Sequence, residues 1–170
     1  VSCGVMLEII RVMLSSPMTS LSNNLIFLFN GAEEIILTGS HGFITQHKWA
    51  QAIRVCPSQD SLHQRPFSRL LSPSRLLFQS GPGHPWLVQS YIKSAVHPFG
   101  SIIGEEIFQS GIIPSDTDFR VFRDHGRVPG LDIAFIDRGE VYHTEHDTAA
   151  RIPGGSVQRA GDNVLAVLHR

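Results

Sequence analysis

Apolar residues recur at intervals of three and four positions from Val5 to Leu14, and again from Phe43 to Ile53. This is the spacing of one face of an amphipathic helix. Ser and Asp directly after Pro114 are typical of a helix start, since both residue types cap helix N-termini. We therefore expect helices over residues 1–15, 40–54, about 85–96 and 156–169, and a helix start at 114–116 with Ser115 as its N-cap.

Short apolar runs between these helices predict the strands of a sheet. Residues 25–29 (LIFLF) lie between Asn and Gly and have the continuous apolar character of a strand buried on both faces. Further strands are expected at 76–78, around 102–108 and at 131–136. Strands that alternate with helices indicate an α/β fold. We expect a three-layer domain with a mainly parallel central sheet flanked by helices.

The pattern breaks between residues 55 and 75. This segment is rich in Ser, Pro, Arg and Gln and has no period of 2 or 3.6 residues. We interpret it as an aberrant insert in a domain that otherwise covers residues 1–170. The interpretation predicts disorder at 56–74 and the loss of a central strand.

Composition excludes some classes of function without selecting one. Charged residues make up 17% of the chain and the formal net charge is -1. Because both signs are scattered, we expect neither a nucleic-acid groove nor an acidic tail. No apolar run approaches the ~20 residues of a membrane span, and we expect no signal peptide. Cys3 and Cys56 could pair, but one possible pair does not identify a redox compartment.

Candidate catalytic residues follow two of the predicted strands, at the end where α/β sheets bind ligands. Glu33 and Glu34 come after the strand at 25–29, and Tyr142 and His143 come after the strand at 131–136. Two carboxylates and an imidazole could hold a Zn²⁺ ion, with the second carboxylate accepting a proton from the activated water. From spacing alone, a simpler interpretation is favoured. In it the two Glu residues open a helix and suit its dipole, and His143 is a loop residue.

The motifs around these residues resemble those of the co-catalytic zinc aminopeptidase family, which also contains glutamate carboxypeptidases and glutaminyl cyclases. Four stretches carry the resemblance in the same order along the chain: 29–34 (FNGAEE), 39–43 (GSHGF), 115–119 (SDTDF) and 142–148 (YHTEHDT). Within the family the sequence is most similar to endoplasmic reticulum metallopeptidases of the Felix-ina type. That likeness rests on residues 42–47 (GFITQH), 108–116 (FQSGIIPSD) and 158–163 (QRAGDN).

The resemblance implies a role for each residue of the candidate site. Glu33 would be the general base, and Glu34 would be a ligand of one zinc ion. His143 would bind the other zinc ion, and Tyr142 could donate a hydrogen bond to the developing oxyanion.

Two aspartates and several histidines have less certain assignments. The resemblance would place Asp116 and Asp118 near the substrate or in contact with the residues that bind it. An Asp in the first turn of a helix is also stabilised there without any such role. Surface or packing roles are expected for the histidines that match no ligand position: His41, His47, His84 and His97.

The sequence departs from the family at the metal site. Family members hold two zinc ions with five protein ligands, and two of these ligands normally precede the helix with which this chain begins. A third would follow Arg54, where the chain has residues 55–60 (VCPSQD), and the surroundings of Asp60 do not match. Glu34 and His143 remain, whereas a catalytic zinc takes at least three protein ligands. We therefore expect the chain as given to bind zinc weakly and to hydrolyse peptides slowly or not at all.

The function implied by the resemblance is that of a zinc-dependent metallo-exopeptidase of the aminopeptidase type, acting on peptides. Two alternatives stay open. One is a glutaminyl cyclase-like acyl transfer on the same fold, and the other is a non-catalytic homologue or fragment with a binding role. Felix-ina-type enzymes are multi-pass proteins with a lumenal peptidase domain. The likeness therefore implies the endoplasmic reticulum membrane, although this chain contains no predicted span.

Overall fold

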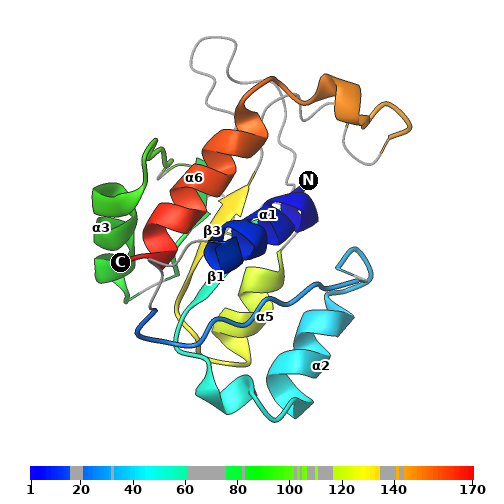
Figure 1. The fold of residues 1–170 in the computed structure, drawn as a ribbon. Coiled ribbons are helices and arrows are strands. Elements are labelled where there is room, and N and C mark those ends of the chain that lie inside the picture. The colour runs from blue at the N-terminus through cyan, green and yellow to red at the C-terminus, as the bar shows by residue number, and fades with distance from the viewer. Residues whose placement is uncertain are drawn as a thin grey trace.

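The fold is that of a computed structural model, drawn in Figure 1. Helices pack around a small sheet. The first helix and the last helix of the chain lie on the same side of this sheet. The structure describes residues 1–15, 21–31, 33–60, 76–81, 83–101, 103, 105–106, 110, 117–134, 141 and 144–170.

Three of the predicted helices are confirmed with nearly the expected bounds. They are α1 (Ser2–Ser15), α3 (Pro85–Ser94) and α6 (Ser156–Leu168). The helix expected over 40–54 is shorter: α2 spans Thr38–Gln46 and is followed by a 3-10 turn, η1, at Ala50–Ala52. Ala50 and Ile53 nevertheless pack against the same apolar cluster as α2. The apolar spacing therefore reported a shared packing face rather than one continuous helix.

The helix start expected at 114–116 lies outside the described residues. The structure places the N-cap position at Thr117, and α5 runs over Asp118–Asp124. A second 3-10 turn, η3, lies at Ala149–Arg151. None of the helices described in the structure is long and apolar enough to cross a membrane.

The described strands form a sheet in the order β1-β3-β2. Its central strand is β3 (Gly130–Ala134), which is buried along its whole length. On one side β1 (Cys56–Asp60) pairs with it in parallel, and on the other β2 (Leu76–Gln79) pairs antiparallel, with an irregularity between Leu77 and Gln79. Mixed α/β organisation and the strand expected at 76–78 are thus confirmed, and the strand expected at 131–136 is confirmed over its described residues, 131–134. The described sheet has one parallel and one antiparallel pair and is not mainly parallel as expected.

Strand β1 corrects the expectation that residues 56–74 lack order. Residues 56–60 form a strand in spite of their poor strand composition, because ladder hydrogen bonds come from the backbone of β3 and not from the side chains. Pro57 is tolerated since β1 lies at an edge of the described sheet. The rest of the segment, residues 61–75, lies outside the described residues.

Two other strand predictions differ from the structure. Residues 24–30 are irregular, and none of the described strands pairs with them. Phe27 packs against one apolar cluster and Leu28 against another, while Ile26 and Phe29 are 40% and 45% exposed. The apolar character of this run therefore reflects side chains that pack into two clusters, and not a strand paired in the described sheet. In the segment expected as a strand at 102–108, the described residues 103, 105 and 106 are helical.

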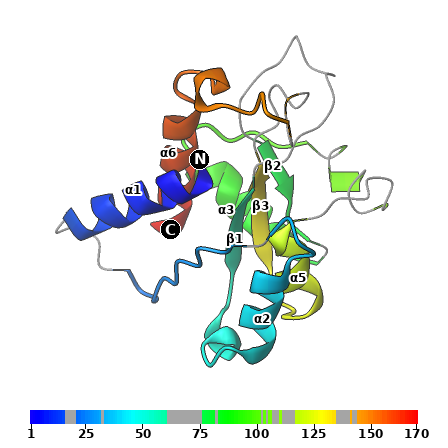
Figure 2. The same ribbon diagram turned by 90° about the vertical axis from the view of Figure 1, so that its right-hand side faces the viewer.

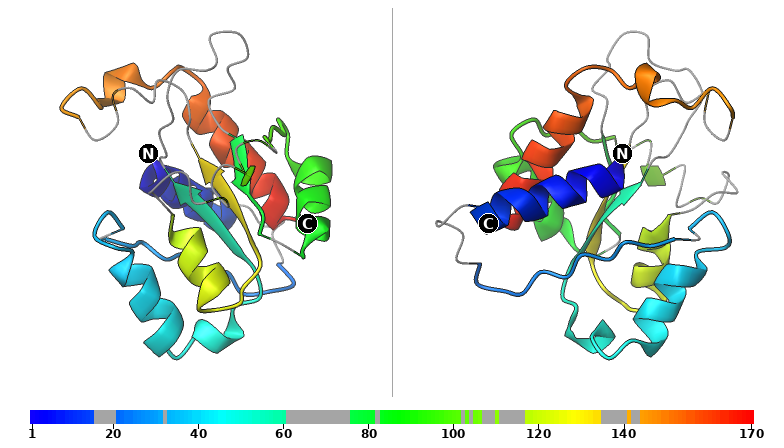
Figure 3. Two further views of the ribbon diagram at one scale, coloured as in Figure 1. Left: turned by 180° about the vertical axis from the view of Figure 1, so that it is seen from behind. Right: turned by 45° about the vertical axis from the view of Figure 1, so that its right-hand side comes forward.

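Helices cover both faces of the sheet, as Figure 2 shows, with α1, α3 and α6 on one side and α2 and α5 on the other. Leu131 and Ile133 of β3 face the first side and pack with residues of its three helices. Ile44 of α2 packs with Val121 and Phe122 of α5 on the second side. Figure 3 shows α1 lying against α6, and α2 beside α5. The two layers hold the chain segments that precede and follow the candidate site.

Candidate active site

Glu33 and Glu34 lie in a tight turn that joins residues 24–30 to α2. The backbone N–H of Leu37 donates to the carbonyl of Glu33 at 3.1 Å. Glu33 is half-buried and Glu34 is exposed. Because α2 begins only at Thr38 and has no acidic residue in its first turn, the interpretation that the two carboxylates open a helix is wrong.

The backbone after the two carboxylates is strained. Ile36 and Leu37 have φ values of 51° and 58°, in the left-handed region that favours glycine. Each such residue costs on the order of 1–3 kcal/mol and persists only when its surroundings impose it. Ile36 is 87% exposed, so burial of its side chain does not impose the conformation. Leu37, in contrast, packs against the apolar cluster of α2 and α5, and its backbone N–H donates to the carbonyl of Glu33, so these contacts act together with those at the ends of the turn.

Asn30 connects the start of this turn to Asp118. Its Nδ2 donates to Asp118 Oδ1 at 3.0 Å and to Asp118 Oδ2 at 2.8 Å. Asp118 is the first residue of α5 and lies 88 positions further along the chain. A hydrogen bond to a carboxylate is stronger than a neutral one. The structure thus brings two of the sequence motifs together, those at 29–34 and 115–119.

Behind Asp118, buried polar residues fix the start of α5. Thr117 Oγ1 donates to Asp132 Oδ2 at 2.7 Å, and Gln79 Nε2 donates to the same oxygen at 3.3 Å. Thr117 and Asp132 are fully buried, and Gln79 is 1% exposed. The two bonds to Asp132 Oδ2 offset part of the cost of burying these polar groups.

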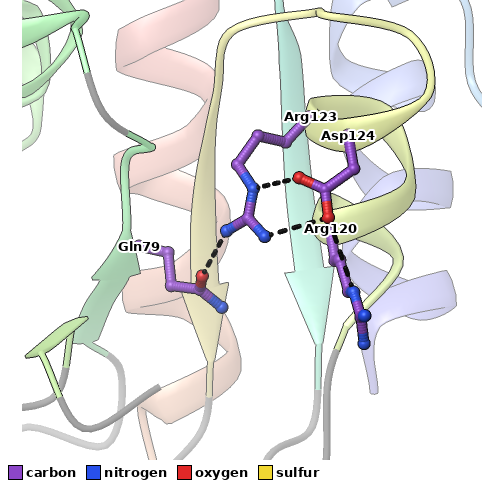
Figure 4. A network of polar contacts seen from close by, with 4 residues as sticks. All are labelled: Gln79, Arg120, Arg123 and Asp124. Carbon is purple, nitrogen blue, oxygen red and sulfur yellow. Dashed lines mark hydrogen bonds and ion pairs between the residues drawn. The ribbon is translucent and has the colours of Figure 1, made fainter. Parts of the chain in front are cut away.

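The polar contacts continue to the outer side of α5. Arg123 Nη1 lies 3.5 Å from Gln79 Oε1, and Arg123 Nε donates to Asp124 Oδ1 at 2.7 Å. Arg120 pairs with the same carboxylate from the previous turn, as Figure 4 shows. The hydrogen bond from Arg123, followed by the positive charges of Arg123 and Arg120, lowers the pKa of Asp124.

Cys56 is the first residue of β1 and lies near the carboxylates of Asp132 and Asp118. Burial raises the pKa of its thiol to about 12, with further contributions from the negative charges of Asp132 and Asp118. Both cysteines are free in the structure, so the pairing of Cys3 with Cys56 that the sequence allowed is not formed.

Of the predicted site residues, Glu33, Glu34 and Asp118 are described, whereas Asp116, Tyr142 and His143 lie outside the described residues. The roles of those three stay predictions. The ring of His41 meets that of His125 edge to face, with the ring centroids 4.8 Å apart. The ring of His47 stacks on that of Phe43, with the centroids 4.9 Å apart. His84 is half-buried, and exposed His97 bonds Asn163 through its backbone.

Several residues of the site had no signal in the sequence. Asn30, Gln79, Thr117 and Asp132 are identified only by the contacts that bring distant segments together. Asn30 and Thr117 lie inside the motifs, but nothing in their spacing marks them as contact residues.

The donors fit a metal ion only in part. Glu34 offers an exposed carboxylate, a ligand type that zinc accepts. Within the described parts of the chain, however, no three His, Cys, Asp or Glu side chains lie together in a way that could hold a metal. A zinc site here would therefore need ligands beyond the described residues, and the sequence predicts His143 as one of them.

Comparison with known proteins supports the resemblance seen in the motifs. The chain is 55% identical over 168 residues to endoplasmic reticulum metallopeptidase 1 of Rattus norvegicus and to that of Homo sapiens. These alignments cover 99% of this chain and 18% of each relative. A vacuolar membrane protease of Schizosaccharomyces pombe (strain 972 / ATCC 24843) is 32% identical over 127 residues, which is 74% of this chain and 14% of that protein.

The chain thus spans 18% of the length of these two endoplasmic reticulum metallopeptidases. No solved structure matches it. The predicted likeness to endoplasmic reticulum metallopeptidases is confirmed. The sequence pattern of peptidase family M28 matches residues 1–168, nearly the whole chain. The chain therefore belongs to peptidase family M28.

Proposed function

We propose that this chain is part of a zinc-dependent metallo-exopeptidase domain of the aminopeptidase type, which hydrolyses peptide bonds. The observation that supports it best is the strained turn that presents Glu33 and Glu34 and is fastened to Asp118 by Asn30, in a member of a metallopeptidase family. Strain of this kind collects at functional sites. The whole fold would be a zinc-exopeptidase-like three-layer domain, of which this chain is an incomplete part.

Each residue of the candidate site would have one task. Zinc, when bound, supplies a water molecule whose pKa is lowered towards neutrality. Glu33 would accept a proton from that water, while Glu34 and His143 would be metal ligands. Tyr142 would donate a hydrogen bond to the oxyanion that develops on the substrate carbonyl.

Asp116 and Asp118 would orient the substrate or the residues around it. Asp118 has its two oxygens occupied by Asn30, which suits a positioning role better than direct chemistry. The segment at about 55–75 would remain an insert of the domain, with β1 formed by its first residues.

The names of the relatives suggest a location. Because endoplasmic reticulum metallopeptidase 1 is so named in Homo sapiens and Rattus norvegicus, we propose the endoplasmic reticulum as the location of this chain. A lumenal position in a membrane protein is proposed from the resemblance of the motifs alone.

Hydrolysis of reporters by the product of the full open reading frame tests the proposal. The purified protein is stripped with a chelator, zinc is restored, and a panel of aminoacyl reporters is offered beside a peptide with an N-terminal glutamine. Zinc-dependent release from the reporters is expected. Ring closure of the glutamine without release would show a glutaminyl cyclase-like transferase instead, and no reaction in either assay would favour a binding role.

A further inference from the structure

The side chain of Asn30 has close contacts on both sides of its amide. On one side Nδ2 lies between the two oxygens of Asp118, at 3.0 and 2.8 Å. On the other side Oδ1 lies against the backbone of Gly39. The approach is so close that a Cβ at position 39 would lie only 1.8 Å from Oδ1. One side chain therefore contacts the start of α5 and the first turn of α2.

These contacts close the base of the turn that carries Glu33 and Glu34. The turn begins after the irregular segment 24–30 and ends where α2 begins, at Thr38. Asn30 and Gly39 therefore lie at its two ends. Ile36 and Leu37 hold left-handed conformations between those ends. If the ends separate, nothing in the exposed side chain of Ile36 keeps the strained backbone in place.

Building on the proposed function, we propose that Asn30 is a positioning residue of the active site. It closes the turn 31–38 and so fixes the carboxylates of Glu33 and Glu34 relative to Asp118. The chemistry of the contact requires a neutral amide of this length. A carboxylate at position 30 would repel that of Asp118, and a side chain at position 39 would occupy the space of Oδ1.

The variant Asn30→Ala, made in the product of the full open reading frame with zinc restored, tests the proposal by two measurements. Hydrogen exchange of the amides of residues 33–37 should become faster. The kcat for reporter hydrolysis should fall at least about tenfold with KM within about twofold, since misplacement by 1 Å can cost ~100-fold. Asn24→Ala is the matched control, because Asn24 is an exposed residue of the same segment and should change neither.

A second pair of variants approaches the contact from α2. Gly39→Ala adds a Cβ that would meet Asn30, so it should speed exchange and lower kcat as Asn30→Ala does. Gly42→Ala adds its Cβ where nothing lies within 4 Å and should do neither. Thermal unfolding of each variant establishes that the protein is folded under the assay conditions.

Exchange of donor and acceptor provides a rescue. Asn30→Asp alone places two carboxylates together and should speed exchange at residues 33–37. Asn30→Asp combined with Asp118→Asn reverses the direction of the hydrogen bond and should restore slow exchange. The proposal would be overturned if Asn30→Ala had the hydrogen exchange rates and kcat of the wild type. It would also be overturned if hydrogen exchange at residues 33–37 were as fast in the double variant as in Asn30→Asp alone. A wild-type protein that hydrolyses no reporter would refute the proposed function, and closure of the turn is then decided by the exchange measurement alone.

Discussion

At the scale of single residues, the candidate site combines two exposed or half-exposed carboxylates with a strained backbone behind them. Left-handed Ile36 and Leu37 together cost on the order of 2–6 kcal/mol. The charge-assisted hydrogen bond that Asn30 Nδ2 shares between the two oxygens of Asp118 contributes about 1.5–3 kcal/mol. The contact of the half-buried Asn30 amide is therefore of the same order as the strain in the turn.

Cys56 provides a test of its environment at the sheet edge, where burial, followed by the charges of Asp132 and Asp118, raises the pKa of its thiol. With a thiol pKa of about 12, only about one Cys56 in ten thousand is a thiolate at pH 8. We predict that iodoacetamide at this pH labels exposed Cys3 at least about 100-fold faster than Cys56. Mass spectrometry of the two peptides measures the ratio, and the urea-unfolded chain is the control in which both thiols react. Equal rates in the folded chain would contradict the environment described for Cys56.

At the scale of elements, α5 links the sheet to the candidate site. Its first residue is bonded by Asn30, its N-cap residue Thr117 is bonded to β3, and its last turn carries the Arg123–Asp124 pair. A helix of seven residues is too short to be stable by itself in water. These contacts and the buried Phe119 and Phe122 therefore fix where it begins and ends.

The ion pairs on α5 predict a dependence of stability on pH. Since the folded pKa of Asp124 is lowered, its contribution is present above the unfolded pKa of about 4 and is lost as pH falls through the lower folded value. We expect Asp124→Asn to reduce the free energy of unfolding by less than about 1 kcal/mol at pH 7, because the side chain is 42% exposed. Urea unfolding at pH 7 and pH 3 measures it. A difference that grows towards pH 3 would be inconsistent with the pairing.

Sequence patterns predicted elements where local spacing decides the structure. The helices α1, α3 and α6 were predicted because each packs one face on the sheet. The run at 25–29 was not predicted correctly, since an apolar run looks the same whether it pairs in a ladder or divides its side chains between two clusters. Strand β1 was missed because its hydrogen bonds depend on the backbone of β3.

In the candidate site, the motifs identified Glu33, Glu34 and Asp118. The bond between Asn30 and Asp118 joins residues 88 positions apart, and no local pattern encodes such a distance. The same holds for Gln79 and Asp132, which are 53 positions apart.

At the scale of the whole molecule, the chain has a folded framework and only part of the proposed metal site. Helices cover both faces of the sheet, and the turn at Glu33 leads into α2 and is joined to α5 through Asn30. The described residues contain no group of three metal-binding side chains. If Glu34 and His143 are its ligands, as proposed, the site has fewer than the three that a catalytic zinc takes.

This shortfall predicts weak metal binding by the isolated 170-residue chain. Zinc titration calorimetry should show no tight site, and reporter hydrolysis by the isolated chain should be slow or absent. Tight binding of two equivalents of zinc would show that residues of this chain complete the site. Calcium in place of zinc is a suitable control for non-specific binding to carboxylates, since it prefers six to eight oxygen ligands.

We propose that Glu33 and Glu34 have separate roles, Glu33 as general base and Glu34 as metal ligand. The most direct test of this proposal is the kcat and zinc content of Glu33→Gln in the product of the full open reading frame, with Glu34→Gln beside it. We predict that Glu33→Gln keeps its zinc and loses kcat by about 100-fold or more, whereas Glu34→Gln loses zinc affinity. A Glu33→Gln variant with full zinc content and wild-type kcat would contradict the account.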